Sequence, residues 1–329
     1  MKTKNTYIKD IRPGDKVVDT FLVTEKNLAY SQKGSPYLNL RLKDRTGELD
    51  GKVWDNASEW ERVFNRGDVI RIHSRAVNYK NAVQLSVLSL QKVDEDAVDL
   101  ADYFPRAKGD IEQMFSELMA FVDRIETPCL RALLDAFFKD EKTASLFKRA
   151  PAAKGFHHVY IGGLLEHTLS VTKLLDIVTH HYQGINRDLL LTGGILHDIG
   201  KIHEYSYNRT IDYSDEGRLI GHIVISLEMV DARIAGMDFP EQLAMELRHL
   251  ILSHHGLLEF GSPKRPKTLE ALIVHYIDDL DAKVNAFQQY IGGDPNVASD
   301  WTPFHRLFER FIYKGKGDQR RREDDSGAE

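Results

Sequence analysis

The chain has 329 residues, of which 42% are hydrophobic and 29% charged, and a formal net charge of −6. This composition is typical of a globular protein long enough for two domains, and the negative balance excludes nucleic-acid binding through a basic field over the whole surface. The single cysteine, Cys129, excludes a disulfide framework and a cysteine-based zinc site. Without an apolar signal core or a membrane-length apolar stretch, we expect a cytoplasmic protein with no membrane partner.

The first 93 residues have the pattern of β-strands. Period-two alternation and β-branched runs recur in five segments, and Asp44-Arg45-Thr46-Gly47 forms a turn between the second and the third. One short helix fits residues 56–64. Five strands with a helix before the fourth are typical of an OB-fold, so residues 1–93 are predicted to form a nucleic-acid-binding β-barrel. The strands are expected at residues 17–23, 37–42, 48–54, 69–73 and 82–87.

After about residue 94 the apolar pattern changes to helical spacing. Residues 94–108 are acidic and contain Pro105, which indicates a linker, and residues 109–312 show helical periodicity without a further convincing strand. Residues 313–329 alternate glycine with charged side chains and are predicted to form a disordered charged tail. The predicted fold class is therefore multidomain α+β, with an N-terminal β-barrel followed by an all-α domain.

Histidines and aspartates of the helical part are candidate metal ligands. Of the 14 histidines, 13 lie beyond residue 150. A lone helical histidine is more often an ordinary core or surface side chain, but clustering favours ligation. Imidazole and carboxylate without thiolate suit a borderline-to-hard divalent ion with room for water and phosphate oxygens. The candidates are His167, His197, Asp198, His222, His254, His255 and Asp278.

Seven ligands are more than one ion needs. An aspartate that bridges two ions would use them all, and two metals about 3.5–4 Å apart can clamp the attacking and leaving oxygens of a phosphodiester. We assign this bridging, catalytic role to Asp198, and Asp281 remains an alternative to Asp278 one turn away. The competing hypothesis is a single ion bound by His167, His197, Asp198 and Asp278. The other six ligands divide into His167, His197 and Asp278 for one ion and His222, His254 and His255 for the other.

Lysine, arginine and aromatic side chains are candidates for substrate contact, with ordinary surface polarity as the alternative for each. Lys201, nearly one helical turn after Asp198, can meet a phosphate oxygen and is counted as catalytic. In the barrel, aromatic rings can stack on bases while cations follow phosphates. We expect Trp54 in the core, and Tyr37 and Tyr79 exposed. The remaining candidates are Lys154, His157 and His158 before the first metal station, Lys264 and Arg265 after the last histidine pair, and Arg41 and Lys80 in the barrel.

The motifs follow one another as Ala150–Lys154, Gly162–Thr168, Leu196–Lys201, Gly221–Ile223, Ser253–Gly256, Gly261–Lys264 and Asp278–Lys283. The order of the histidines and aspartates resembles that of the HD phosphohydrolases. The whole arrangement, up to about residue 312, resembles the bacterial 3′–5′ exoribonucleases of the YhaM type, which join an OB-fold to an HD domain. The resemblance implies Mn²⁺- or Mg²⁺-dependent removal of nucleotides from the 3′ ends of single-stranded RNA, with single-stranded DNA as a further substrate.

Two other functions remain open. An HD-type nucleotide phosphohydrolase or cyclic-dinucleotide phosphodiesterase would act on a small substrate, which would not need the barrel. The other is a non-catalytic nucleic-acid-binding protein with a degenerate HD domain. Such a protein would not need a metal-binding side chain at all seven candidate positions. A homo-oligomer would bind a long strand with higher avidity, although no residue pattern requires one.

Overall fold

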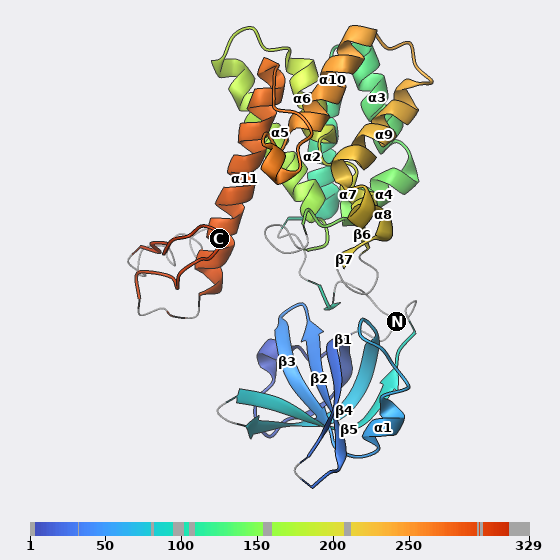
Figure 1. Ribbon diagram of the computed structural model, residues 1–329, viewed down its shortest axis with the longest axis vertical. Coiled ribbons are helices and arrows are strands. Elements are labelled where there is room, and N and C mark those ends of the chain that lie inside the picture. The colour runs from blue at the N-terminus through green and yellow to red at the C-terminus, as the bar shows by residue number, and fades with distance from the viewer. Residues whose placement is uncertain are drawn as a thin grey trace.

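The computed structural model describes residues 4–31, 33–79, 82–94, 102–104, 109–153, 160–206, 212–294, 296 and 299–315. Figure 1 shows a β-barrel built from the first part of the chain and a separate helical body above it. Four of the predicted substrate contacts, namely Lys80, Lys154, His157 and His158, lie outside the described residues.

The barrel confirms the predicted OB-fold. Its five strands close in the order β1-β2-β3-β5-β4, with β3 and β5 parallel and the other pairs antiparallel. Alternation along β2 sends Leu38, Leu40 and Leu42 into the core and places Tyr37 and Arg41 on the outer face. The elements are β1 (Lys16–Tyr30), β2 (Pro36–Asp44), β3 (Gly47–Val53), α1 (Ala57–Trp60), β4 (Val69–Tyr79) and β5 (Ala82–Lys92), preceded by the 3₁₀-helix η1 (Ile8–Asp10).

The prediction that Trp54 belongs to the core is wrong. Val53 fills the inward position at the end of β3, so the next side chain turns outward and is 49% exposed. There its ring stacks on Tyr37, with centroids 4.7 Å apart and planes at 25°. Tyr37 is consequently half-buried rather than fully exposed, whereas Tyr79 is exposed as expected.

The helical body is built around one large apolar cluster. Side chains of α2, α3, α5, α6 and α10 form its centre, and nearly all of its members are fully buried. The expectation of no further strand is wrong, because two strands pair after α7. With two residues each, they are too short to show alternation. The elements are α2 (Ile111–Asp123), α3 (Pro128–Phe138), α4 (Glu141–Arg149), α5 (Gly163–His181), α6 (Arg187–Leu196), α7 (Lys201–Glu204), β6 (Tyr205–Ser206), β7 (Asp212–Tyr213), α8 (Asp215–Leu219), α9 (His222–Ile234), α10 (Glu241–Ser253), the 3₁₀-helix η4 (Leu258–Phe260) and α11 (Leu269–Gly293).

Both predicted boundary segments contain residues that pack on the folded parts. In the segment predicted as linker, Tyr103 donates a hydrogen bond to Thr20 Oγ1 at 2.6 Å and is buried with Phe104 against Leu22 of the barrel. At the predicted start of the tail, Lys314 Nζ lies 2.7 Å from the Asp294 carboxylate. The tail boundary at residue 313 therefore falls too early. In the described part of the chain, no helix has both the length and the apolarity needed to cross a membrane.

Candidate metal centre

Five helices bring the seven candidate ligands to one place inside the helical body. His167 lies in the second turn of α5, His197 and Asp198 directly follow α6, and His222 begins α9. His254 and His255 follow α10, and Asp278 lies on α11. The start of α9 can approach Asp198 because Gly200 has no side chain. A Cβ at Gly200 would lie 2.4 Å from the His222 carbonyl oxygen and 2.6 Å from the Ser226 nitrogen.

The ligand atoms fall into two groups. Within each group they lie within 4.8 Å of one another, and the groups are Asp198 with His222, His254 and His255, and His167 with His197 and Asp278. The same division of the other six residues was predicted from the sequence, with Asp198 as a bridge between the groups rather than a member of one.

Asp198 lies between the two groups, with one oxygen toward each. Its Oδ2 is 3.3 Å from His197 Nε2 and 3.7 Å from His167 Nε2. Its Oδ1 is 3.4 Å from His222 Nε2 and 3.6 Å from His254 Nε2. The two oxygens of one carboxylate thus face different sets of imidazoles, which is the geometry that a bridging ligand requires.

Backbone carbonyls fix the tautomers of three imidazoles. The Nδ1 atoms of His197, His254 and His255 each lie 2.7 Å from a carbonyl oxygen, of Gly194, Ile251 and Phe260 respectively. A carbonyl oxygen only accepts, so Nδ1 donates its hydrogen, and in the neutral ring the lone pair lies on Nε2. Each ring is thereby oriented to bind a cation through Nε2.

Carboxylates fix the other two imidazoles, and the sequence predicted neither contact. His167 Nδ1 lies 2.8 Å from Asp281 Oδ2, and His222 Nδ1 lies 2.9 Å from Glu204 Oε1. Asp278 instead faces the cluster, 3.1 Å from His167 Nε2. Asp281 therefore orients a ring from outside while Asp278 is placed among the ligand atoms. Glu204 follows Asp198 closely in the sequence, but no periodicity links it to His222 eighteen residues later.

The residues present fit a divalent cation. The Nε2 atoms of His197, His222 and His254 and Oδ1 of Asp198 are buried, and none has a hydrogen-bond partner among the described residues. A buried polar atom without a partner costs ~1–3 kcal/mol, and cations held by the two groups would satisfy all four. The mixed nitrogen and oxygen donor set, without sulfur, suits a borderline-to-hard divalent ion.

The charges of the cluster differ between its two sides. Burial would raise the pKa of Asp198, but Lys201 and the His197 ring hold that pKa well below its usual range. Burial would lower the pKa of His197, yet Asp198 and Asp278 raise it to about 10. On the other side, burial and the neighbouring His254 lower the pKa of His255 to about 4. The second group thus favours neutral imidazoles, the form that binds metal.

Lys201 is buried, so the alternative of a solvated lysine is wrong. Its Nζ lies 2.5 Å from Asp198 Oδ2. Lys264 and Arg265 are exposed on the segment after η4, beyond His255 in sequence. In the barrel, the Arg41 guanidinium is neutralised by Glu48 at 3.1 Å and Asp50 at 2.8 Å.

In the barrel, a lysine also lies over two aromatic rings, a contact that was not predicted from the sequence. The Lys52 ammonium lies 4.8 Å from the Tyr37 ring centroid and 5.7 Å from that of Trp54. We refer to these three residues as the aromatic patch. Alternation on adjacent strands was the signal for it, but the core assignment of Trp54 hid it.

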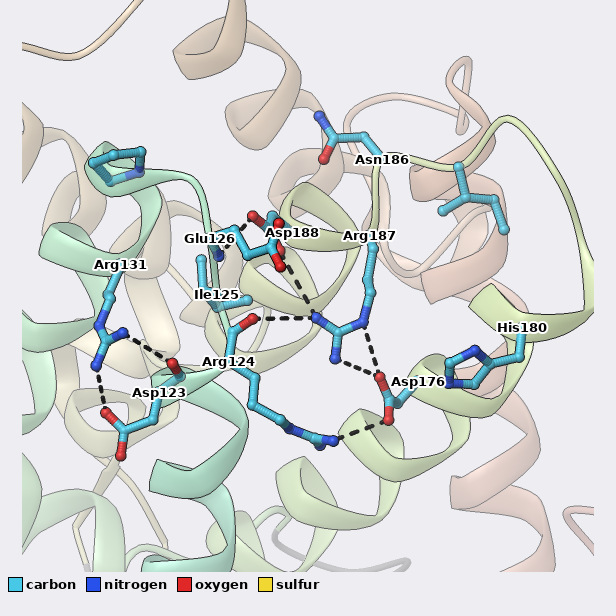
Figure 2. Close-up of a pocket in the computed structure, with 12 residues that line it drawn as sticks. Asp123, Arg124, Ile125, Glu126, Arg131, Asp176, His180, Asn186, Arg187 and Asp188 are labelled. Carbon is cyan, nitrogen blue, oxygen red and sulfur yellow. Dashed lines mark hydrogen bonds and ion pairs between the residues drawn. The ribbon is translucent and has the colours of Figure 1, made fainter.

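A separate hollow of about 1090 Å³ opens between the end of α2, the end of α5 and the start of α6. Figure 2 shows that its three arginines pair with aspartate side chains. Arg187 lies 2.6 Å from Asp176, and Arg131 lies 2.6 Å from Asp123. The hollow shares no residue with the metal cluster, and its guanidinium groups are already paired, so we assign it no part in substrate binding.

Comparison with known proteins places both parts of the chain. The family model described as HD domain matches residues 164–283, and the one described as OB-fold nucleic acid binding domain matches residues 22–93. The chain is 34% identical over 273 residues to a protein of Geobacillus sp. (strain WCH70) named 3′-5′ exoribonuclease YhaM, covering 83% of this chain and 84% of that protein.

Two solved structures are each similar to about a quarter of this chain. The second OB-fold domain of replication protein A from Methanococcus maripaludis is 19% identical, covering 27% of this chain and 94% of that one with a TM-score of 0.23. The single-stranded DNA binding protein of Thermus aquaticus is 22% identical, covering 24% of this chain and 40% of that one with a TM-score of 0.23.

Replacing the carboxylate behind His222 should weaken metal binding. We expect Glu204→Gln to lower the affinity for Mn²⁺ by about tenfold or more, because the buried charge that orients the His222 ring and raises its basicity is lost. Calorimetric titration of the metal-free protein with Mn²⁺ measures this. Glu228→Gln, on the exposed side of the same α9, is the matched control and should titrate as the wild type does. Equal affinities for all three proteins would contradict the role given to Glu204.

Proposed function

Because the chain belongs to the family of the YhaM-type 3′–5′ exoribonucleases, we propose that it removes nucleotides from the 3′ ends of single-stranded RNA by metal-dependent hydrolysis. The observation that carries this proposal is Asp198, whose two oxygens face two separate groups of ligand atoms. We propose two ions, Mn²⁺ or Mg²⁺, and single-stranded DNA as a second substrate. The single Cys129 accords with a reducing, cytoplasmic location.

The seven ligands would hold the ions, and the chain's other groups would hold the ligands. Two bound ions would supply a water of lowered pKa and neutralise charge on the phosphate oxygens. Asp198 would link the two groups and fix their separation. Lys201, proposed from the sequence to contact phosphate directly, instead pairs with Asp198 Oδ2, so we assign it the positioning of that carboxylate.

The aromatic patch would hold the strand on the barrel. Tyr37 and Trp54 offer stacking surface to bases, and Lys52 supplies a cation beside them. Stacking tolerates every base because each has a π-face, so the patch could hold strands of varied sequence. Arg41 contributes less, because Glu48 and Asp50 already neutralise it. An enzyme acting on small nucleotides would have no use for this patch.

Asp198→Asn should abolish hydrolysis of a 5′-labelled single-stranded RNA in Mn²⁺. The amide keeps the volume of the side chain but removes the charge and one of the two acceptor oxygens that face the groups. Asp279→Asn is the matched control, because Asp279 is partly exposed and pairs with Lys283. Circular dichroism and Tm verify the fold of both variants. Turnover near that of the wild type in Asp198→Asn would refute the metal assignment.

Trp54→Ala should weaken binding to a long single-stranded RNA by about tenfold or more, since stacking contributes ~1–3 kcal/mol per base. It should leave the cleavage rate of a dinucleotide unchanged, because a dinucleotide reaches only the metal centre. Fluorescence anisotropy measures the binding and a discontinuous assay the cleavage. Trp301→Ala removes a similarly exposed tryptophan outside the barrel and should affect neither. Equal losses on both substrates would mean that Trp54 supports the fold instead.

A 5′-labelled RNA with an internal hairpin should shorten stepwise and stop a few nucleotides from the stem. The metal ligands are buried among packed helices, and a base-paired helix is too wide to reach them. The barrel would retain the remaining strand after each cut. Early release of the label as a mononucleotide, internal cuts, or passage through the stem would each contradict the proposed polarity and substrate.

A further inference from the structure

Three of the seven candidate ligands are partly exposed. His167, His197 and His254 are fully buried. The side chains of His222 and Asp278 are 12% and 16% exposed, and His255 is half-buried. These last three side chains are therefore the ones that a substrate in solution can reach.

Two short segments next to His222 and His255 expose apolar side chains. Leu219, 86% exposed, and Ile220 come directly before Gly221 and His222. Leu257, Leu258 and Phe260 come directly after His255 and Gly256, and all three are exposed. The rings of His222 and His255 lie 5.1 Å apart, so both segments leave the cluster from neighbouring points. Exposed apolar side chains next to a polar cluster mark a place where a ligand binds.

The segment that carries Phe260 is held in a defined conformation. The Phe260 carbonyl accepts from His255 Nδ1 at 2.7 Å, and its N–H donates to the Leu257 carbonyl at 3.1 Å. The buried Ser262 hydroxyl lies 2.9 Å from the Leu252 carbonyl oxygen and 2.7 Å from that of Lys264, so its one hydrogen is shared between them or donated to either. Phe260 is nevertheless 62% exposed. The backbone of Phe260 thus orients the His255 ring, and the same hydrogen bond holds the exposed Phe260 side chain next to the cluster.

We propose that Phe260, with Leu257, Leu258, Leu219 and Ile220, forms a subsite for the nucleobase of the terminal nucleotide that is cut off. This rests on the proposed nuclease function and adds a base-binding element to it. Among the five side chains, Phe260 supplies a π-face, and none of the five has a polar group that could read a base edge. The subsite therefore binds any base by stacking and apolar contact while the terminal phosphodiester lies over the metal cluster.

The test compares 5′-labelled RNA of one sequence with an intact or an abasic 3′-terminal residue, in Mn²⁺. The wild type should prefer the intact end by about tenfold in kcat/KM. Phe260→Ala should lose this preference by slowing only the intact substrate, Phe260→Leu should retain part of it, and Phe260→Trp should restore it. Phe311→Ala, which removes a similarly exposed phenylalanine near the C-terminus, should keep the full preference.

Each outcome separates the subsite from the function on which it rests. Equal hydrolysis of the two ends by the wild type overturns the subsite and leaves the nuclease function standing, and this comparison needs no variant. A loss in Phe260→Ala that is equal for both substrates also overturns it, because that result assigns Phe260 to the support of His255. Absence of hydrolysis of either RNA by the wild type overturns both.

Discussion

The structure depends on burying five imidazoles and two carboxylates at a point where five helices meet. Such groups are costly to bury unless each is held by a partner, and the three buried Nε2 atoms without one make the cluster a liability until a cation binds. The surrounding apolar cluster supplies the opposing stabilisation, with side chains such as Leu196 and Ile199 fully buried on either side of His197 and Asp198. Apolar burial elsewhere in the core thus offsets the free-energy cost of burying these polar groups, and a bound cation would lower that cost.

Each group of ligands contains one imidazole supported by a carboxylate. His167 is oriented by Asp281 in one group and His222 by Glu204 in the other, while the remaining imidazoles donate to backbone carbonyls. A carboxylate partner raises the basicity of a ligating imidazole more than a neutral carbonyl does. Each group therefore contains one imidazole whose orientation and basicity depend on a buried carboxylate outside the group.

Local sequence patterns predicted most of the fold. What they could not predict were contacts between residues far apart in the sequence. Alternation and β-branched runs identified the five barrel strands, because each such signal lies within one element. The seven ligands were proposed from short motifs on separate helices, and their side-chain atoms gather in two groups. Asp281 and Glu204 were not recognised as ring partners, since the first is separated from His167 by 114 residues and only helix packing joins them. Trp54 was misplaced because strand alternation fixes which side chains share a face but does not fix where the strand ends.

The barrel is joined to the metal centre by packing as well as by the chain. Tyr103 and Phe104 are buried against Leu22 of β1, and Ile161 packs on the same small cluster. α5 begins two residues after Ile161 and carries His167 in its second turn. A strand held by the barrel is therefore presented by a surface that is anchored close to a ligand-bearing helix, rather than by a module on a free tether. In the proposed exonuclease, such anchoring would limit the loss of orientational freedom when the strand end enters the site, so that binding on the barrel would favour the geometry needed for hydrolysis.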